Sequence, residues 1–205
     1  MACILVVLIV LSLAGCKKTE QIPNDDQTTT TTTTTTETTT DEDLGPTLSH
    51  EEAKATIVGT WVYDEKISPQ KFYGDYYNEK ITKTDVQMRT TYKFNQDGTY
   101  SATVTISNIS DVRKEYRSLM VEGARINSES NGKLLTTAEV KYYESYADGI
   151  LKDICKEKKS TYEIDGNKIK YGDSTTETFG FKNKQLILKG STQTGDSYKI
   201  TLKKK

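Results

Sequence analysis

Side chains that usually carry catalysis are scarce in this sequence of 205 residues. His50 is its only histidine, and no Ser, Cys or Asp that follows it stands in a nucleophile motif. His50 and Glu51 begin like a zinc-protease motif, but the second histidine of that motif is absent. Cys155 is a lone thiol, and a lone cysteine is usually a small buried apolar residue. We therefore predict a protein that is not an enzyme, with no catalytic residues, no metal site and no cofactor.

The sequence also lacks the patterns of a calcium site and of a nucleic-acid-binding surface. Asp97-Gly98 and Asp165-Gly166 start like calcium loops, but neither has acidic residues repeated at alternate positions. Both are therefore predicted to be turns. The 28 basic and 29 acidic side chains nearly cancel, which argues against a protein that binds nucleic acid through its charge.

The first 16 residues carry no charge and end in Leu13-Ala14-Gly15-Cys16. A membrane-spanning helix needs about 20 apolar residues, whereas a shorter run before small residues is typical of a signal peptide. The four residues resemble the lipobox of bacterial lipoproteins. This resemblance implies cleavage between Gly15 and Cys16, diacylglyceryl attachment to the Cys16 thiol, and a membrane anchor on the extracytoplasmic face. The alternative is a buried segment of the fold with Cys16 as a core thiol, and the polar residues that follow argue against it.

Residues 17–48 differ in composition from the rest of the chain. They hold seven acidic and two basic residues, and 12 of the 13 residues from Thr28 to Thr40 are threonine. Such a segment cannot offset its ordering entropy by burying apolar side chains, so we predict a disordered or extended spacer. The predicted organisation is a signal peptide over 1–15, a lipidated cysteine and linker over 16–48, and one domain over 49–205.

The predicted domain opens with a short helix and continues as strands. Ser49 and Glu52 have the spacing of a capping box, which predicts a helix over about 49–56. Alternating or β-branched runs separated by turn residues then predict strands at 57–63, 92–94, 100–106, 162–164, 169–171, 178–181, 186–188 and 198–202. Strands at steps of about ten residues favour an antiparallel meander, and closure removes its edges. We therefore predict an all-β, antiparallel up-and-down barrel.

The segment between residues 111 and 157 is ambiguous. Val112, Tyr116 and Leu119 have helical spacing, but 119–126 also fits a strand. Residues 136–155 fit either a helix or a hairpin that turns at 147–149. We expect strands here, because Gly149 is unfavourable inside a helix and the neighbouring segments are rich in strand signals.

The layout resembles a lipocalin-like domain, in which a short helix leads into a first strand that opens with Gly-x-Trp, here Gly59-Thr60-Trp61. The resemblance implies that Trp61 is structural and that a cation near the C-terminus packs on it, here a lysine such as Lys199 or Lys203 in place of arginine. It also implies that the long connection over 65–87 lies over the barrel mouth. Because that family has no shared ligand motif, it indicates no ligand-binding residue.

Two functions fit these observations. The first is a monomeric, membrane-anchored extracytoplasmic lipoprotein that captures a small apolar or amphipathic ligand inside its barrel. The second is an envelope interaction or structural module that holds a protein or glycan on its outer surface. A cavity of about 300 Å³ or more lined by Tyr, Phe and Leu would support the first, and a filled core would support the second. The 13 tyrosines suit either a binding surface or ordinary strands.

Overall fold

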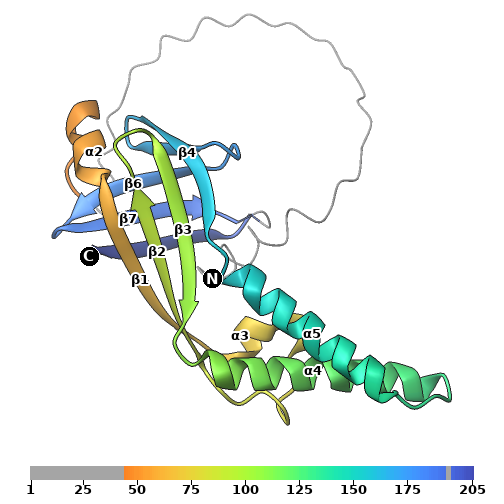
Figure 1. Ribbon diagram of the computed structural model, residues 1–205. Helices are drawn as coiled ribbons and strands as arrows, with labels where there is room; N and C mark the ends of the chain where they lie inside the picture. The colour runs from red at the N-terminus through yellow and green to blue at the C-terminus, as the bar shows by residue number, and fades with distance from the viewer. Residues whose placement is uncertain (1–43, 193–194) are drawn as a thin grey trace, which may run out of the picture.

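A computed structural model describes residues 44–192 and 195–205 of the chain. Their eight antiparallel strands form one closed barrel in sequence order, and β8 pairs with β1 to complete it (Figure 1). The predicted up-and-down barrel is confirmed. The predicted signal peptide, Gly15, Cys16 and the threonine run lie outside the described residues. The strands are β1 (Gly59–Ile67), β2 (Val86–Phe94), β3 (Thr99–Ile106), β4 (Lys158–Asp165), β5 (Lys168–Tyr171), β6 (Thr176–Lys182), β7 (Gln185–Ser191) and β8 (Ser197–Lys204).

The strands follow the period of two that a half-buried sheet requires. In β2 every second side chain from Val86 to Phe94 is buried and faces the barrel interior. The predicted turns join these strands: Gly98 has φ +79° between β2 and β3, and Gly166 has φ +59° between β4 and β5. The Asp97 carboxylate accepts a hydrogen bond from the Thr99 backbone N–H at 2.9 Å, so this aspartate serves the turn.

The predicted N-terminal helix is α2 (His50–Ile57). Its capping box is present, because the Ser49 side chain accepts from the Glu52 backbone and the Glu52 carboxylate accepts from the Ser49 N–H at 3.0 Å. Ala53 and Ile57 turn towards the barrel and are buried. The helix therefore covers the end of the barrel where β1 begins (Figure 1).

Residues 44–48, which the sequence assigned to the linker, lie against β6. Leu44 is 5% exposed. Gly180 makes the close approach possible, since a Cβ at that position would lie 2.6 Å from the Cβ of Leu44. The packed part of the chain therefore begins at Leu44, five residues before the predicted domain boundary.

The expectation of strands over 111–157 is wrong. This segment forms two antiparallel helices, α4 (Ile109–Ser130) and α5 (Thr137–Ile154), which we call the hairpin. It is inserted between β3 and β4 and projects from the end of the barrel opposite α2 (Figure 1). Gly149 did not prevent the helix, because its cost of about 1 kcal/mol is small beside the burial of Ala147, Leu151 and Ile154.

The connection between β1 and β2 carries the small helix α3 (Pro69–Tyr73) and the 3₁₀ turn η1 (Gly74–Tyr76). Tyr73 is buried and stacks on Tyr116 of α4, with ring centroids 5.5 Å apart. Its hydroxyl donates to the Glu115 carboxylate at 3.1 Å. This connection therefore fixes the base of the hairpin against the barrel.

Two clusters of buried apolar side chains make up the core. The barrel cluster lies at the α2 end and contains Ala53, Ile57, Trp61, Tyr92, Phe94, Tyr162, Ile169, Tyr171, Phe179, Leu186, Leu188, Tyr198, Ile200 and Leu202. The hairpin cluster lies at the other end and contains Ile67, Tyr73, Val86, Met88, Val104, Ile106, Val112, Tyr116, Leu119, Met120, Ala147, Leu151 and Ile154. The base of the hairpin thus shares a core with the barrel, while its tip extends beyond both.

Candidate functional site

Helix α2 and Trp61 cover the end of the barrel at which β1 begins. The Trp61 side chain is 2% exposed, and its indole N–H donates to the Ile57 carbonyl oxygen at 2.7 Å. The Nζ of Lys204 lies 5.2 Å from the centroid of the Trp61 ring. The resemblance to lipocalin-like domains implied Lys199 or Lys203 at this position. Lys204 takes this place because it pairs directly with Trp61 in the ladder between β1 and β8.

Glu177 places a carboxyl group inside the barrel. It is 4% exposed, and the hydroxyl of Tyr171 donates to its Oε2 at 2.7 Å. The hydroxyl of Tyr198 donates to Oε1. Burial raises the pKa of Glu177, and these two hydrogen bonds oppose that rise. Burial and the neighbouring carboxyl group also raise the pKa of both tyrosines, so their hydroxyls stay protonated donors. The three side chains satisfy one another and form a closed polar network.

Glu65 is the second acidic side chain that turns inward. Its Oε1 lies 2.9 Å from Lys71 Nζ, and its Oε2 is buried with no hydrogen-bond partner among the described residues. It lies on β1 two residues before the buried Ile67, so it is close to the hairpin end of the barrel. A single water can satisfy such an oxygen where there is room for it.

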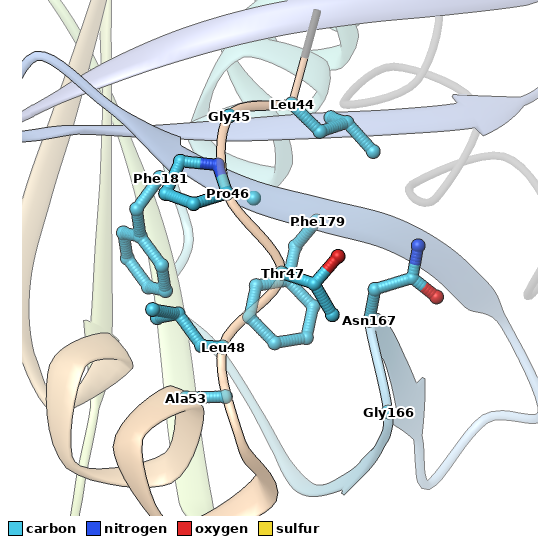
Figure 2. Close-up of a pocket in the computed structure, with 11 residues that line it drawn as sticks. Leu44, Gly45, Pro46, Thr47, Leu48, Ala53, Gly166, Asn167, Phe179 and Phe181 are labelled. Atoms are coloured by element: carbon cyan, nitrogen blue, oxygen red, sulfur yellow. The ribbon is translucent and has the colours of Figure 1, made fainter. Parts of the chain in front are cut away.

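A small hollow lies beside the segment 44–48 (Figure 2). Leu48, Ala53 and Phe179 contribute apolar walls, and Asn167 contributes an amide. Its volume of about 40 Å³ holds one or two water molecules. This hollow is therefore much smaller than a ligand pocket of about 300 Å³.

A larger groove lies on the outer face of the hairpin. Its volume is about 500 Å³, within the range of binding sites for ligands and peptide side chains. Most of its lining comes from α4, with two residues from α5 and one from the loop before β2. The lining residues are Ile81, Ser110, Arg113, Lys114, Arg117, Ser118, Val121, Glu122, Val140 and Glu144.

Positive charge gathers at the end of this groove nearest the barrel. Arg117 Nε donates to Asp148 Oδ1 at 2.9 Å, and Arg113 Nε lies 3.6 Å from the same oxygen. Because Arg117 donates both its hydrogen bonds to this carboxylate, it holds the pKa of Asp148 below its ordinary value. Lys114 is exposed and has no carboxylate within ion-pair distance in residues 44–192 and 195–205. Asp148 and the groove-lining Glu144 thus face two arginines, with Lys114 as a third cation beside them.

Neither sequence nor structure comparison assigns this chain to a family. No family model, curated protein or solved structure matches it.

The structure separates the residues that the sequence analysis considered for chemistry. His50 is the exposed first residue of α2, and Cys155 is half-buried at the end of α5, where burial raises the pKa of its thiol. Asp97 lies at the turn between β2 and β3, and Asp165 lies at the turn between β4 and β5. Within the described ranges, no group of three or more His, Cys, Asp or Glu is placed to hold a metal ion. None of the helices described there is long and apolar enough to cross a membrane.

The groove was missed because the hairpin was expected to be strands. Two signals in the sequence could have identified it. Thr136 and Glu139 form a second capping box with the same spacing as Ser49 and Glu52, and the Glu139 carboxylate accepts from the Thr136 N–H at 2.8 Å. Arg113 and Arg117 are spaced by four residues, which places both cations on one face of a helix.

Proposed function

We propose that this protein is a non-enzymatic extracytoplasmic lipoprotein, anchored through Cys16, whose filled barrel presents the hairpin to a partner protein. The observation that carries the proposal is the contrast between the barrel interior and the hairpin. The interior side chains Ile169, Leu186 and Leu202 are completely buried. The groove of about 500 Å³ lies outside, on the hairpin.

The placement of the hairpin supports the same proposal. Leu44 leads the chain onto the barrel beside β6, at the end that α2 covers. The hairpin leaves the barrel at the opposite end (Figure 1). An anchor that precedes Leu44 would hold the α2 end nearer the membrane and leave the hairpin directed away from it. The groove would then be accessible to a protein in the space outside.

Capture of a small apolar ligand inside the barrel stays a prediction. Such capture requires one covered end of the barrel to open. Trp61 and Ile57 close the α2 end, and Tyr116 and Leu151 pack across the hairpin end. Exposing a buried side chain of this size to water costs about 1.5–3 kcal/mol. The ligand would have to repay that cost before it bound with any net affinity.

Site-specific photo-crosslinking tests the proposal in the native membrane. A photoreactive residue replaces Ser118 in the groove or, as the control, the exposed Glu163 on the barrel wall. We expect a discrete protein adduct from position 118 and none from position 163. Native mass spectrometry of the purified mature protein is the second measurement. A stoichiometric small molecule in the barrel, together with equal adducts from both positions, would overturn the proposal.

A further inference from the structure

We infer that the groove on the hairpin binds an amphipathic helix of the partner protein, with acidic side chains on the flank that meets Arg113, Lys114 and Arg117. This inference rests on the proposed function, because it names the chemistry of the partner that the hairpin receives. It follows from three properties of the groove: its charge, its apolar floor and its place between two helices.

The charge of the groove leaves cations available to a ligand. Asp148 and Glu144 are the carboxylates near Arg117, and Asp148 is shared with Arg113. Glu122 also lines the groove but is held by Arg125, with N–O distances of 2.9 and 2.7 Å. Lys114 faces solvent beside them. A carboxylate from a partner would meet Lys114 and the two arginines, and this complementarity favours an acidic ligand over a basic one.

Three aliphatic side chains line the groove, and we call them its apolar floor. Ile81, Val121 and Val140 are each half-buried, and they come from the loop before β2, from α4 and from α5. Covering half-buried aliphatic side chains with another apolar surface removes them from water, which is favourable. The ligand therefore needs apolar side chains as well as acidic ones.

The shape of the site favours a helical ligand. Val121 and Val140 lie on two antiparallel helices, and a third helix laid along such a pair can place its residues i, i+3, i+4 and i+7 between them. Beyond its base the hairpin has little support from the barrel, and exposed apolar residues such as Ile126 and Leu134 lie near its tip. A partner helix would complete a three-helix bundle with this pair.

The acidic segment of the same chain does not have the required chemistry. Residues 17–43 carry seven acidic side chains, but Ile22 is their only residue among Ala, Val, Leu, Ile and Met. One aliphatic residue cannot cover the three that form the floor. The occupant is therefore a segment of another protein in which acidic and apolar residues alternate at helical spacing.

A defined peptide tests the inference with the full mature chain. The probe is a fluorescein-labelled peptide of about 18 residues, made of Leu, Ala and Glu with leucines at helical spacing, and its partner probe has Lys in place of Glu. We expect the acidic peptide to raise its fluorescence anisotropy with a Kd on the order of 10 µM and the basic peptide to bind at least about tenfold more weakly.

Charge reversal locates the site. Lys114→Glu is expected to weaken the acidic peptide by about tenfold. Lys141→Glu is the matched control, because Lys141 is an exposed lysine of α5 that does not line the groove, and it should change the affinity by less than about twofold. Both substitutions are on the surface, and circular dichroism checks that the helices remain.

Two outcomes would overturn the inference: equal binding of the acidic and basic peptides, or equal effects of the two substitutions. Absence of saturable binding up to about 1 mM would do the same. Sedimentation of the protein alone is measured in parallel, and a dimer broken by Lys114→Glu would show that the occupant is a second copy and reject the inference. If crosslinking gives adducts at position 118 but the acidic and basic peptides bind equally, the proposed function stands and this inference fails.

Discussion

The barrel and the hairpin are stabilised in different ways, although one continuous chain forms both. Each barrel strand pairs with neighbours on both sides, and its inward side chains meet residues from the rest of the ring. The hairpin consists of two packed helices, of which α5 begins with a capping box. Only the base of the hairpin shares a core with the barrel. Its tip carries Ile126 and Leu134 at 56% and 82% exposure. A region with few buried contacts opens at low cost, and such regions are commonly the ones that bind. The barrel is therefore the more firmly packed region, and the tip of the hairpin is the part expected to open most easily.

The largest expected effect is in the barrel. Trp61→Ala removes a nearly fully buried ring and its hydrogen bond to Ile57, so the free energy of unfolding should fall by about 3–5 kcal/mol. Leu134→Ala at the tip of the hairpin should change it by no more than about 0.5 kcal/mol. Urea unfolding followed by circular dichroism measures both. Similar losses from the two substitutions would mean that the tip is packed as firmly as the barrel.

The second prediction concerns pH and also belongs to the barrel. Because burial raises the pKa of Glu177, the folded state holds this proton more tightly than the unfolded state does. The contribution of Glu177 to stability is therefore complete below the unfolded pKa and is lost as pH rises through the folded pKa, by about 1.4 kcal/mol for each unit between them. Glu177→Gln should remove this part of the pH dependence, so its stability relative to the wild type should improve as pH rises.

Tyr198→Phe sharpens the same experiment. The Tyr198 hydroxyl donates to the Glu177 carboxylate and opposes the rise of its pKa. Without that donor the folded pKa should rise further, and the loss of stability should continue to higher pH. Urea midpoints across the range give the profile. If the stabilities of wild type and Glu177→Gln differ by the same amount at every pH, Glu177 ionises equally in the folded and unfolded states, and the network has another role.

The barrel was predictable from the sequence because its signals are local and agree with one another. The alternation of apolar and polar residues from Tyr100 to Ile106 specifies a strand. The Asp-Gly-Asn turn after Ile164 specifies the turn between β4 and β5. Neither signal depends on the rest of the chain. The helical hairpin was not predicted, because Gly149 and the strand-rich neighbouring segments favoured strands. The helix is stabilised by the tertiary burial of Ala147 and Leu151, which a local pattern does not show.

The candidate site was less predictable than the fold. The charge at the groove depends on Asp148 lying beside Arg113 and Arg117, and these residues are about 30 positions apart in sequence. Only the antiparallel pairing of α4 with α5 brings them together. The Glu177 network is of the same kind, since Tyr171, Glu177 and Tyr198 come from three strands. The spacing of Arg113 and Arg117 indicates that they share a face, but not that Asp148 faces them, and no local pattern indicates the Glu177 network.

The smallest expected effect tests how the hairpin tolerates its glycine. Gly149 lies in α5, is exposed, and has open space where a Cβ would be. Gly149→Ala should therefore raise the free energy of unfolding of the hairpin by about 0.5–1 kcal/mol, through lower entropy of the unfolded chain. Native-state hydrogen exchange of α5 amides detects this local change.

Gly98→Ala is the control in the barrel, and it should destabilise the protein, because Gly98 has φ +79° in the turn between β2 and β3. A gain at both positions would contradict the assignment of Gly98 to a conformation that favours glycine, whereas a loss at Gly149 would show that α5 needs the flexibility of this residue.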